Sequence, residues 1–124
     1  MKFAPTLVFC CVLVACSNPA SRSNYAERKT AVEDAMRAEI ACGREHVAEI
    51  DDGTSDASTV ALALALRCNR EYGATTEAWG AAYLDNDTQR RILRQRRSGR
   101  NERVEAFLPT VMQYRQALSS RKTK

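Results

Sequence analysis

The chain has 124 residues, of which 44% are hydrophobic and 27% charged, and a formal net charge of +4 at pH 7. This length leaves room for one small domain with a modest core and argues against a multidomain architecture. Alanine and arginine, both strong helix formers, are frequent, and no stretch alternates apolar and polar residues as a strand does. We therefore expect an all-α fold.

The N-terminus combines Lys2 with a nearly continuous apolar run over residues 3–15, which Ser17-Asn18-Pro19 ends. At about 13 residues the run is shorter than the roughly 20 residues that a membrane-spanning helix needs. A short apolar run that ends in a small residue is typical of a signal peptide. The alternative is a buried N-terminal helix of a cytosolic protein.

The end of this run, Leu13-Val14-Ala15-Cys16, resembles the lipobox of bacterial lipoproteins. The resemblance implies that residues 1–15 are removed as a signal peptide and that Cys16 becomes the lipidated N-terminus in the cell envelope. It also implies, from Ser17, an outer-membrane location facing the periplasm. Three acyl chains would make the anchor nearly permanent. We expect residues 16–23 to form a flexible tether of small polar residues.

The helical domain is expected over residues 24–118, beginning with a helix over residues 24–50. Its buried face is predicted from an apolar stripe at helical spacing: Tyr25, Val32, Met36, Ile40, Gly43, Val47 and Ile50. Gly53 can then take a left-handed turn, and Thr54 or Ser55 can cap a second helix over residues 56–72.

Two cysteines remain for the mature domain, because Cys10 and Cys11 leave with the signal peptide and Cys16 is lipidated. Cys42 and Cys68 lie equally far from Ser55, so an antiparallel hairpin places them opposite each other. Small neighbouring residues would let the helices approach to the Cα separation of roughly 5.5 Å that a disulfide needs. We expect a small helical bundle built on this disulfide-stapled hairpin.

A metal site is the alternative for the two cysteines, because His46 lies one helical turn from Cys42 and Cys68 would supply a third ligand. No fourth ligand is evident, and exported thiol pairs usually oxidise. We therefore predict a disulfide and no metal.

Gly73 predicts the end of the second helix, and Thr75 or Thr76 can cap a third. The expected core-facing residues of this third helix are Trp79, Tyr83 and Leu84.

Two further helices are expected over residues 88–98 and 101–118, separated by Gly99. Pro109 should kink or divide the last one, because proline removes a helical hydrogen bond. Residues 119–124 are predicted to be a frayed basic tail.

The charge is divided along the chain, with acids in excess over residues 24–56 and bases in excess from Thr88 onward. Most of the bases from Thr88 onward belong to one cluster, the arginine run: Arg90, Arg91, Arg94, Arg96, Arg97, Arg100 and Arg103. Arginine favours bidentate contacts with phosphate and carboxylate groups. Outside the inner membrane, the corresponding ligands are anionic lipid, lipopolysaccharide, peptidoglycan and acidic proteins rather than nucleic acid. The alternative is a solvated helix face paired with the acidic first helix.

Signals of catalysis are nearly absent, since the chain has one histidine, no glycine-rich phosphate loop and no His/Cys cluster. We predict no catalytic residue and no cofactor. The segment over residues 52–57, with the Ala/Leu helix that follows it and the flanking Cys42 and Cys68, is similar to small exported helical proteins of proteobacteria without assigned activity.

We therefore expect a lipid-anchored, non-catalytic interaction or accessory component of an envelope assembly, with a protein partner in the envelope. The alternative is a binder of anionic envelope polymers or lipid headgroups through Arg90 to Arg103. A small envelope enzyme is a third possibility.

Overall fold

The computed structural model describes residues 19–122, with side chains from residue 24 onward. This part of the chain is all-α, as expected, and contains no strand. The helices are α1 (Pro19–Ile50), α2 (Ala57–Arg67), α3 (Asn69–Tyr83), α4 (Asp87–Arg97) and α5 (Arg100–Lys122). No helix within residues 19–122 combines the length and apolar character needed to cross a bilayer. The predicted signal peptide and Cys16 lie outside the described residues.

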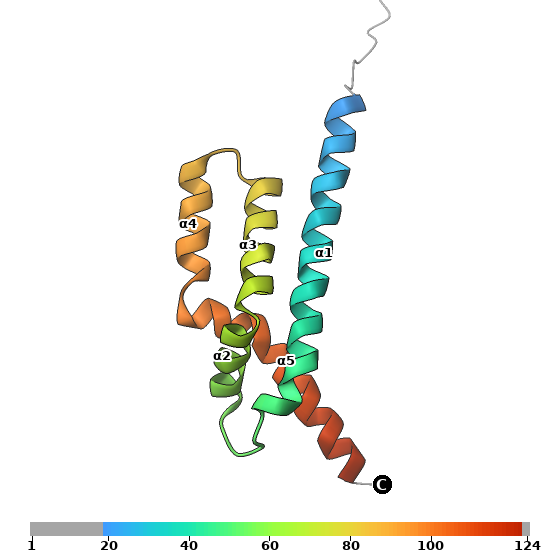
Figure 1. Ribbon diagram of the computed structural model, residues 1–124, viewed down its shortest axis with the longest axis vertical. Helices are drawn as coiled ribbons and strands as arrows, with labels where there is room; N and C mark the ends of the chain where they lie inside the picture. Colours follow the sequence, from blue (N-terminus) through green and yellow to red (C-terminus); the bar gives the residue numbers. More distant parts are fainter. Residues whose placement is uncertain (1–18, 123–124) are drawn as a thin grey trace, which may run out of the picture.

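The helices form a layer with a pair of helices at one end (Figure 1). The layer consists of α1, α3 and α4, in which α3 packs against both of the others. The pair consists of α2 and α5, which share the most extensive contact in the molecule and also pack on α1. As a result, the part of the layer around the α3–α4 connection has no helix over it, and α1 projects beyond that connection (Figure 1).

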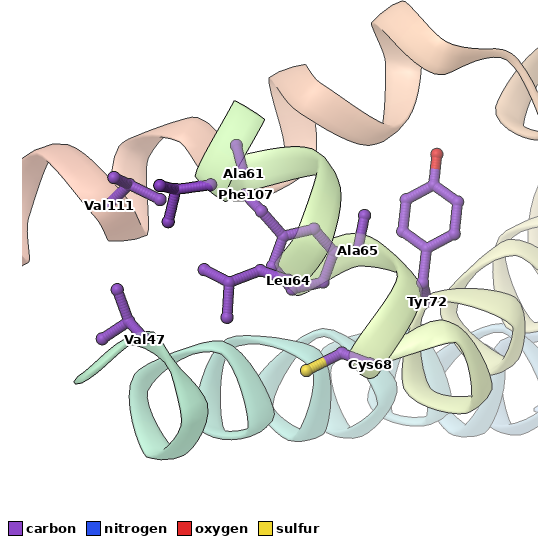
Figure 2. Close-up of a cluster of buried hydrophobic side chains, with 9 residues drawn as sticks. Val47, Ala61, Leu64, Ala65, Cys68, Tyr72, Phe107 and Val111 are labelled. Carbon is purple, nitrogen blue, oxygen red and sulfur yellow. The ribbon is translucent and has the colours of Figure 1, made fainter. Parts of the chain in front are cut away.

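The hydrophobic core lies where α2 is enclosed by α1, α3 and α5. Its α2 residues, Val60, Ala61, Leu64 and Ala65, follow the helical repeat and are at most 2% exposed. Phe107 and Val111 of α5 and Val47 of α1 meet this stripe (Figure 2). The small α2 side chains allow the helices to approach closely around the larger ones.

The disulfide predicted from the sequence is confirmed. Cys42 of α1 and Cys68, at the junction of α2 and α3, are bonded with a Cα–Cα distance of 6.0 Å. Cys68 is fully buried, and its sulfur points toward α1 (Figure 2). A bridge that closes a loop of this length contributes about 3.5 kcal/mol in the chain-entropy account.

The buried face of α1 differs from the predicted stripe. Val32 and Val47 are buried as expected, but Met36 and Ile40 are each 44% exposed, and Glu39 is only 9% exposed. The buried face is therefore rotated toward the side of α1 that carries Glu39 and the disulfide-bonded Cys42. This rotation places Met36 and Ile40 at the edge of the interface.

The second helix ends earlier than predicted. It stops at Arg67, and α3 begins at Asn69 and continues through Gly73, so the predicted boundary at Gly73 is wrong. Thr75 and Thr76 do not cap a helix, because their hydroxyls donate to the carbonyls of Glu71 and Tyr72 one turn earlier, at 3.2 and 3.0 Å. The boundary between α2 and α3 therefore falls at Cys68, which is buried and disulfide-bonded.

The connections between helices follow local side-chain chemistry. Gly53 has the expected positive φ, at 73°. The N-cap of α2 is Asp56, whose carboxylate accepts hydrogen bonds from the backbone of Ser58 and Thr59, rather than Thr54 or Ser55 as predicted. Before α4, the side chain of Asn86 accepts from the backbone of Gln89 at 2.9 Å.

The helix ends also extend beyond the predicted domain limits. Helix α1 begins at Pro19, so residues 19–23 of the expected tether are helical. Helix α5 continues to Lys122, through most of the expected frayed tail, and contains Pro109 without an interruption of the helix. Pro109 is exposed, and so is Glu105 one turn earlier, so water can hydrate the Glu105 carbonyl that a proline amide cannot satisfy.

Candidate functional site

Much of the arginine run fastens α4 to the rest of the molecule. Helix α4 buries none of its own residues. Arg94 forms a two-point ion pair with Glu77 of α3, in which Nε and Nη2 donate to the two carboxylate oxygens at 2.6 and 3.2 Å. This contact lowers the pKa of Glu77. Arg90 donates through Nε and Nη2 to the carbonyl of Leu84 at 3.2 and 3.1 Å. These arginines therefore hold the α3–α4 hairpin together.

Two more arginines surround the ring of Tyr72. The guanidinium carbons of Arg97 and Arg103 lie 4.3 and 5.5 Å from the ring centroid, within cation–π range. The Tyr72 hydroxyl donates to the Arg97 carbonyl at 2.9 Å, and Arg103 donates to Asn69 Oδ1 at 3.0 Å. Burial raises the pKa of Tyr72. This cluster joins the ends of α3, α4 and α5.

The remaining arginines of the run are more exposed. Arg96 lies 3.5 Å from Glu102 of α5. Arg91 and Arg100 are exposed and have no ion-pair partner among the described residues. Within the described part, the run pairs with the acidic first helix at one place, Glu39, so extensive pairing with α1 is not observed.

The contact with α1 is a poorly satisfied charged pair. Arg97 Nη2 lies 3.8 Å from Glu39 Oε2, too far for a good hydrogen bond. Glu39 Oε2 and Arg97 Nε are both buried without a hydrogen-bond partner in this part of the chain. A buried polar atom left in this state costs about 1–3 kcal/mol. The contact is therefore weaker than the ion pair of Arg94 with Glu77, which closes to 2.6 Å.

Arg97 also borders two surface hollows that meet at Trp79. One hollow, of about 250 Å³, lies among α1, α3 and α5; the other, of about 210 Å³, lies between α3, α4 and α5. We call the combined surface the Trp79 face, and its residues are Met36, Glu39, Ile40, Thr75, Trp79, Leu93, Arg96, Arg97, Glu102 and Ala106.

The Trp79 face contains several exposed apolar side chains. Trp79 is 43% exposed, and Met36 and Ile40 each 44%. Tyr83 is 40% exposed and extends the face along α3, with its ring centroid 4.5 Å from that of Trp79. Trp79 and Tyr83 were predicted to face the core, and that prediction is wrong. Clustered exposed apolar side chains of this kind mark interaction surfaces.

The sites weighed for catalysis and metal binding have structural roles. Cys42 and Cys68 are consumed by their disulfide, and His46 Nδ1 lies 3.2 Å from Glu49. No group of three or more potential metal ligands occurs within the described residues.

The acidic loop before α2 is also structural. Asp51 accepts hydrogen bonds from Arg115 of α5 at 2.8 and 2.7 Å, and this contact lowers its pKa. The backbone amide of Ser55 lowers the pKa of Asp52, and the hydroxyl of Ser58 lowers that of Asp56. These carboxylates therefore stabilise the connection between α1 and α2.

Comparison of the chain with protein-family models, curated proteins and solved structures found no match. The assignment of the candidate site therefore rests on its geometry alone. Sequence reasoning identified Arg96 and Arg97 and weighed a pairing of the arginines with the acidic first helix, but it did not single out Glu39 as the contact. Glu39 gave no signal, because its burial depends on the rotation of α1, which local sequence does not encode.

Proposed function

We propose that this chain is a lipid-anchored, non-catalytic interaction component of the bacterial cell envelope, and that it binds another protein surface through the Trp79 face. The exposed cluster of Met36, Ile40 and Trp79 is the observation that carries the proposal. Aromatic residues, methionine and arginine are enriched at protein interfaces, and all three kinds are present here. The lipid anchor is proposed from the lipobox that ends at Cys16.

The size of the hollows favours a protein surface over a small ligand. Pockets for small molecules usually occupy about 300–1,000 Å³ and enclose most of the ligand. The hollows beside Trp79, of about 250 and 210 Å³, are smaller and lie side by side on the surface. They suit two protruding side chains of a partner.

Photo-cross-linking in cells tests this proposal. A photoreactive amino acid at Ile40 should give a discrete cross-linked product in the envelope fraction, because Ile40 lies on the proposed contact face. The matched control is Leu66 of α2, which is 63% exposed but outside the Trp79 face. The absence of any product from Ile40, or equal products from both positions, would overturn the proposal.

The anchor has a separate test. Replacement of Cys16 by Ser removes the sulfur that the lipid would occupy. The variant should lose incorporation of labelled fatty acid and leave the membrane fraction, while a chain with Cys10→Ser should keep both properties. Unchanged lipid labelling of the Cys16→Ser variant would rule out the anchor.

Binding of anionic polymers or headgroups has less support. Arg90, Arg94 and Arg97 are engaged within the molecule, so their removal would also loosen α4. The two exposed arginines without ion pairs, Arg91 and Arg100, give a cleaner test. If the alternative holds, replacing both with Gln should weaken salt-sensitive binding to anionic vesicles or lipopolysaccharide without changing stability.

A further inference from the structure

We propose that a hollow beside Tyr72 binds the phosphate group of a phosphomonoester. This hollow, which we call the Tyr72 hollow, has a volume of about 160 Å³ and is bordered by residues of α3, α4 and α5, among them Tyr72, Arg94, Arg97 and Arg103. It is smaller than the roughly 300 Å³ at which pockets for whole small molecules begin, so it suits a single charged group of a few atoms. The inference requires no protein partner at the Trp79 face.

The Tyr72 hollow has an excess of positive charge. Three arginines border it: Arg94, Arg97 and Arg103. Among its lining residues one carboxylate opposes them, that of Glu77. Arg103 has no ion pair within the described residues, and the pair of Arg97 with Glu39, which lies outside the hollow, is long at 3.8 Å. A phosphomonoester carries about −1.5 to −2 charges at pH 7, which matches the excess of two positive charges among the lining residues.

Each of the three arginines keeps a terminal nitrogen for a ligand. Arg94 donates to Glu77 through Nε and Nη2, and Arg103 donates to Asn69 through Nη1 and to a backbone carbonyl through Nε. Arg94 Nη1, Arg103 Nη2 and Arg97 Nη1 therefore have no hydrogen-bond partner in the described part of the chain. Of the Arg97 nitrogens, Nε alone is both buried and unpaired there, so Nη1 is accessible. Three separate donors suit the three terminal oxygens of a phosphate group.

The guanidiniums are held in place before a ligand arrives. Those of Arg97 and Arg103 lie 4.3 and 5.5 Å from the Tyr72 ring centroid, and Glu77 holds Arg94 at two points. Tyr72 is itself only 3% exposed and donates to the Arg97 carbonyl, which fixes its ring. Side chains that are already ordered lose less freedom on binding. A phosphate group between them would also offset the repulsion between two like charges at one ring.

Gly73 keeps the hollow open on its α3 side. It borders the hollow, and no atom lies within 4 Å of a Cβ placed on it. A larger side chain at this position would project into open space rather than into the core. The site can therefore be filled from Gly73 without a change to any arginine.

Titration of the full-length protein with inorganic phosphate tests the inference. The melting temperature should rise with phosphate and not with sodium chloride at equal ionic strength, because a ligand stabilises the state that binds it. Arg103→Gln should weaken phosphate binding at least about tenfold, because it removes a charged donor. The matched control is Arg100→Gln, an exposed arginine of α5 outside the hollow, which should bind like the wild type. Equal weakening in both variants would overturn the inference.

Gly73→Leu provides a second variant, which leaves the arginines in place. Leucine favours a helix more than glycine does, so the variant should fold. Its side chain should fill the hollow and abolish the phosphate-dependent rise in melting temperature. Unchanged phosphate binding by the folded Gly73→Leu protein would overturn the inference even if Arg103→Gln fails to fold.

Two phosphomonoesters distinguish the possible sources of the phosphate group. Glycerol 3-phosphate is soluble, and dihexanoyl phosphatidic acid carries the same phosphate group on a short-chain lipid. Stronger binding of the lipid would identify a membrane headgroup as the source, and equal or stronger binding of glycerol 3-phosphate would identify a soluble phosphomonoester. Binding of neither would overturn the inference, even if inorganic phosphate bound. None of these results changes the Ile40 cross-link expected above, so this inference and the proposed function fail separately.

Discussion

Tyr72 and Arg97 contact each other twice. The Tyr72 hydroxyl donates to the backbone carbonyl of Arg97 at 2.9 Å, and the guanidinium of the same arginine lies 4.3 Å from the Tyr72 ring centroid. The first contact fixes the C-terminal end of α4 against α3, and the second directs the arginine side chain. Tyr72 belongs to the buried core, so these two contacts connect the core to the Arg97 guanidinium, which borders both hollows of the Trp79 face.

Replacement of Tyr72 by Phe should therefore loosen the end of α4. The variant keeps the ring but loses one hydrogen bond, so we expect the free energy of unfolding to fall by about 1 kcal/mol. Urea denaturation measures this change, and hydrogen exchange should show faster exchange in α4. Tyr114→Phe is the control, because the Tyr114 hydroxyl forms no hydrogen bond within the described part of the chain. Equal losses in the two variants would contradict the assigned role.

Loss of the disulfide should strongly destabilise the domain. With Cys42→Ala and Cys68→Ala together, the unfolded chain gains freedom, and the free energy of unfolding should fall by about 3.5 kcal/mol. Urea denaturation without reductant compares this variant with the wild type. A thiol assay on the unfolded wild-type domain should find neither Cys42 nor Cys68 free. Two free thiols per domain would contradict the observed bridge.

Two glycines in helices should respond to alanine in opposite directions. A methyl group at Gly43 would lie 3.2 Å from the ring of Phe107, which is only 1% exposed and has little room to shift. Overpacking typically costs about 1–3 kcal/mol, which exceeds the gain of about 1 kcal/mol in helix propensity. We therefore expect Gly43→Ala to lower the melting temperature.

Gly73→Ala is the matched comparison. Nothing lies within 4 Å of a methyl group at Gly73, which is inside α3. The helix-propensity gain should then remain unopposed and stabilise the domain by up to about 1 kcal/mol. If both alanine variants shift the melting temperature in the same direction, the close packing at Gly43 is not the deciding factor.

The ion pair between Asp51 and Arg115 should make stability depend on pH. The Asp51 side chain is 1% exposed and accepts two hydrogen bonds from Arg115, which lower its pKa. Its contribution is therefore fully present above the unfolded-state pKa of about 3.9 and is lost as the pH falls through the lower folded-state value.

Asp51→Asn should consequently lower the free energy of unfolding by about 2 kcal/mol at pH 7. The difference from the wild type should shrink as the pH falls below about 4, because the unfolded wild-type chain then binds a proton at Asp51 that the folded chain still excludes. Urea denaturation over a pH series measures this change. Asp34→Asn is the control, since its pair with Arg37 is exposed and should contribute less than about 1 kcal/mol. A difference that is constant with pH would contradict the role of the charge.

Local sequence was sufficient for the helical class, the disulfide and several helix boundaries. Asn86 and Gly53 act through backbone contacts a few residues away, so their roles can be inferred without the rest of the fold. Cys42 and Cys68 were paired correctly because a hairpin with arms of equal length brings them together. These features are determined by contacts between residues close in the chain, or by a single reversal of chain direction between two helices.

The tertiary structure decided which helix faces are covered, and therefore where the candidate site lies. An apolar stripe predicts that a helix buries one side, but it does not fix the rotation or say how many neighbours cover that side. In the folded chain Glu39 is buried and Met36 is 44% exposed. Tyr72 of α3 packs against Phe107 of α5, whereas Trp79, on the same helix, remains 43% exposed. Burial and charge pairing depend on residues from several helices at once, and only the packed structure brings those residues together.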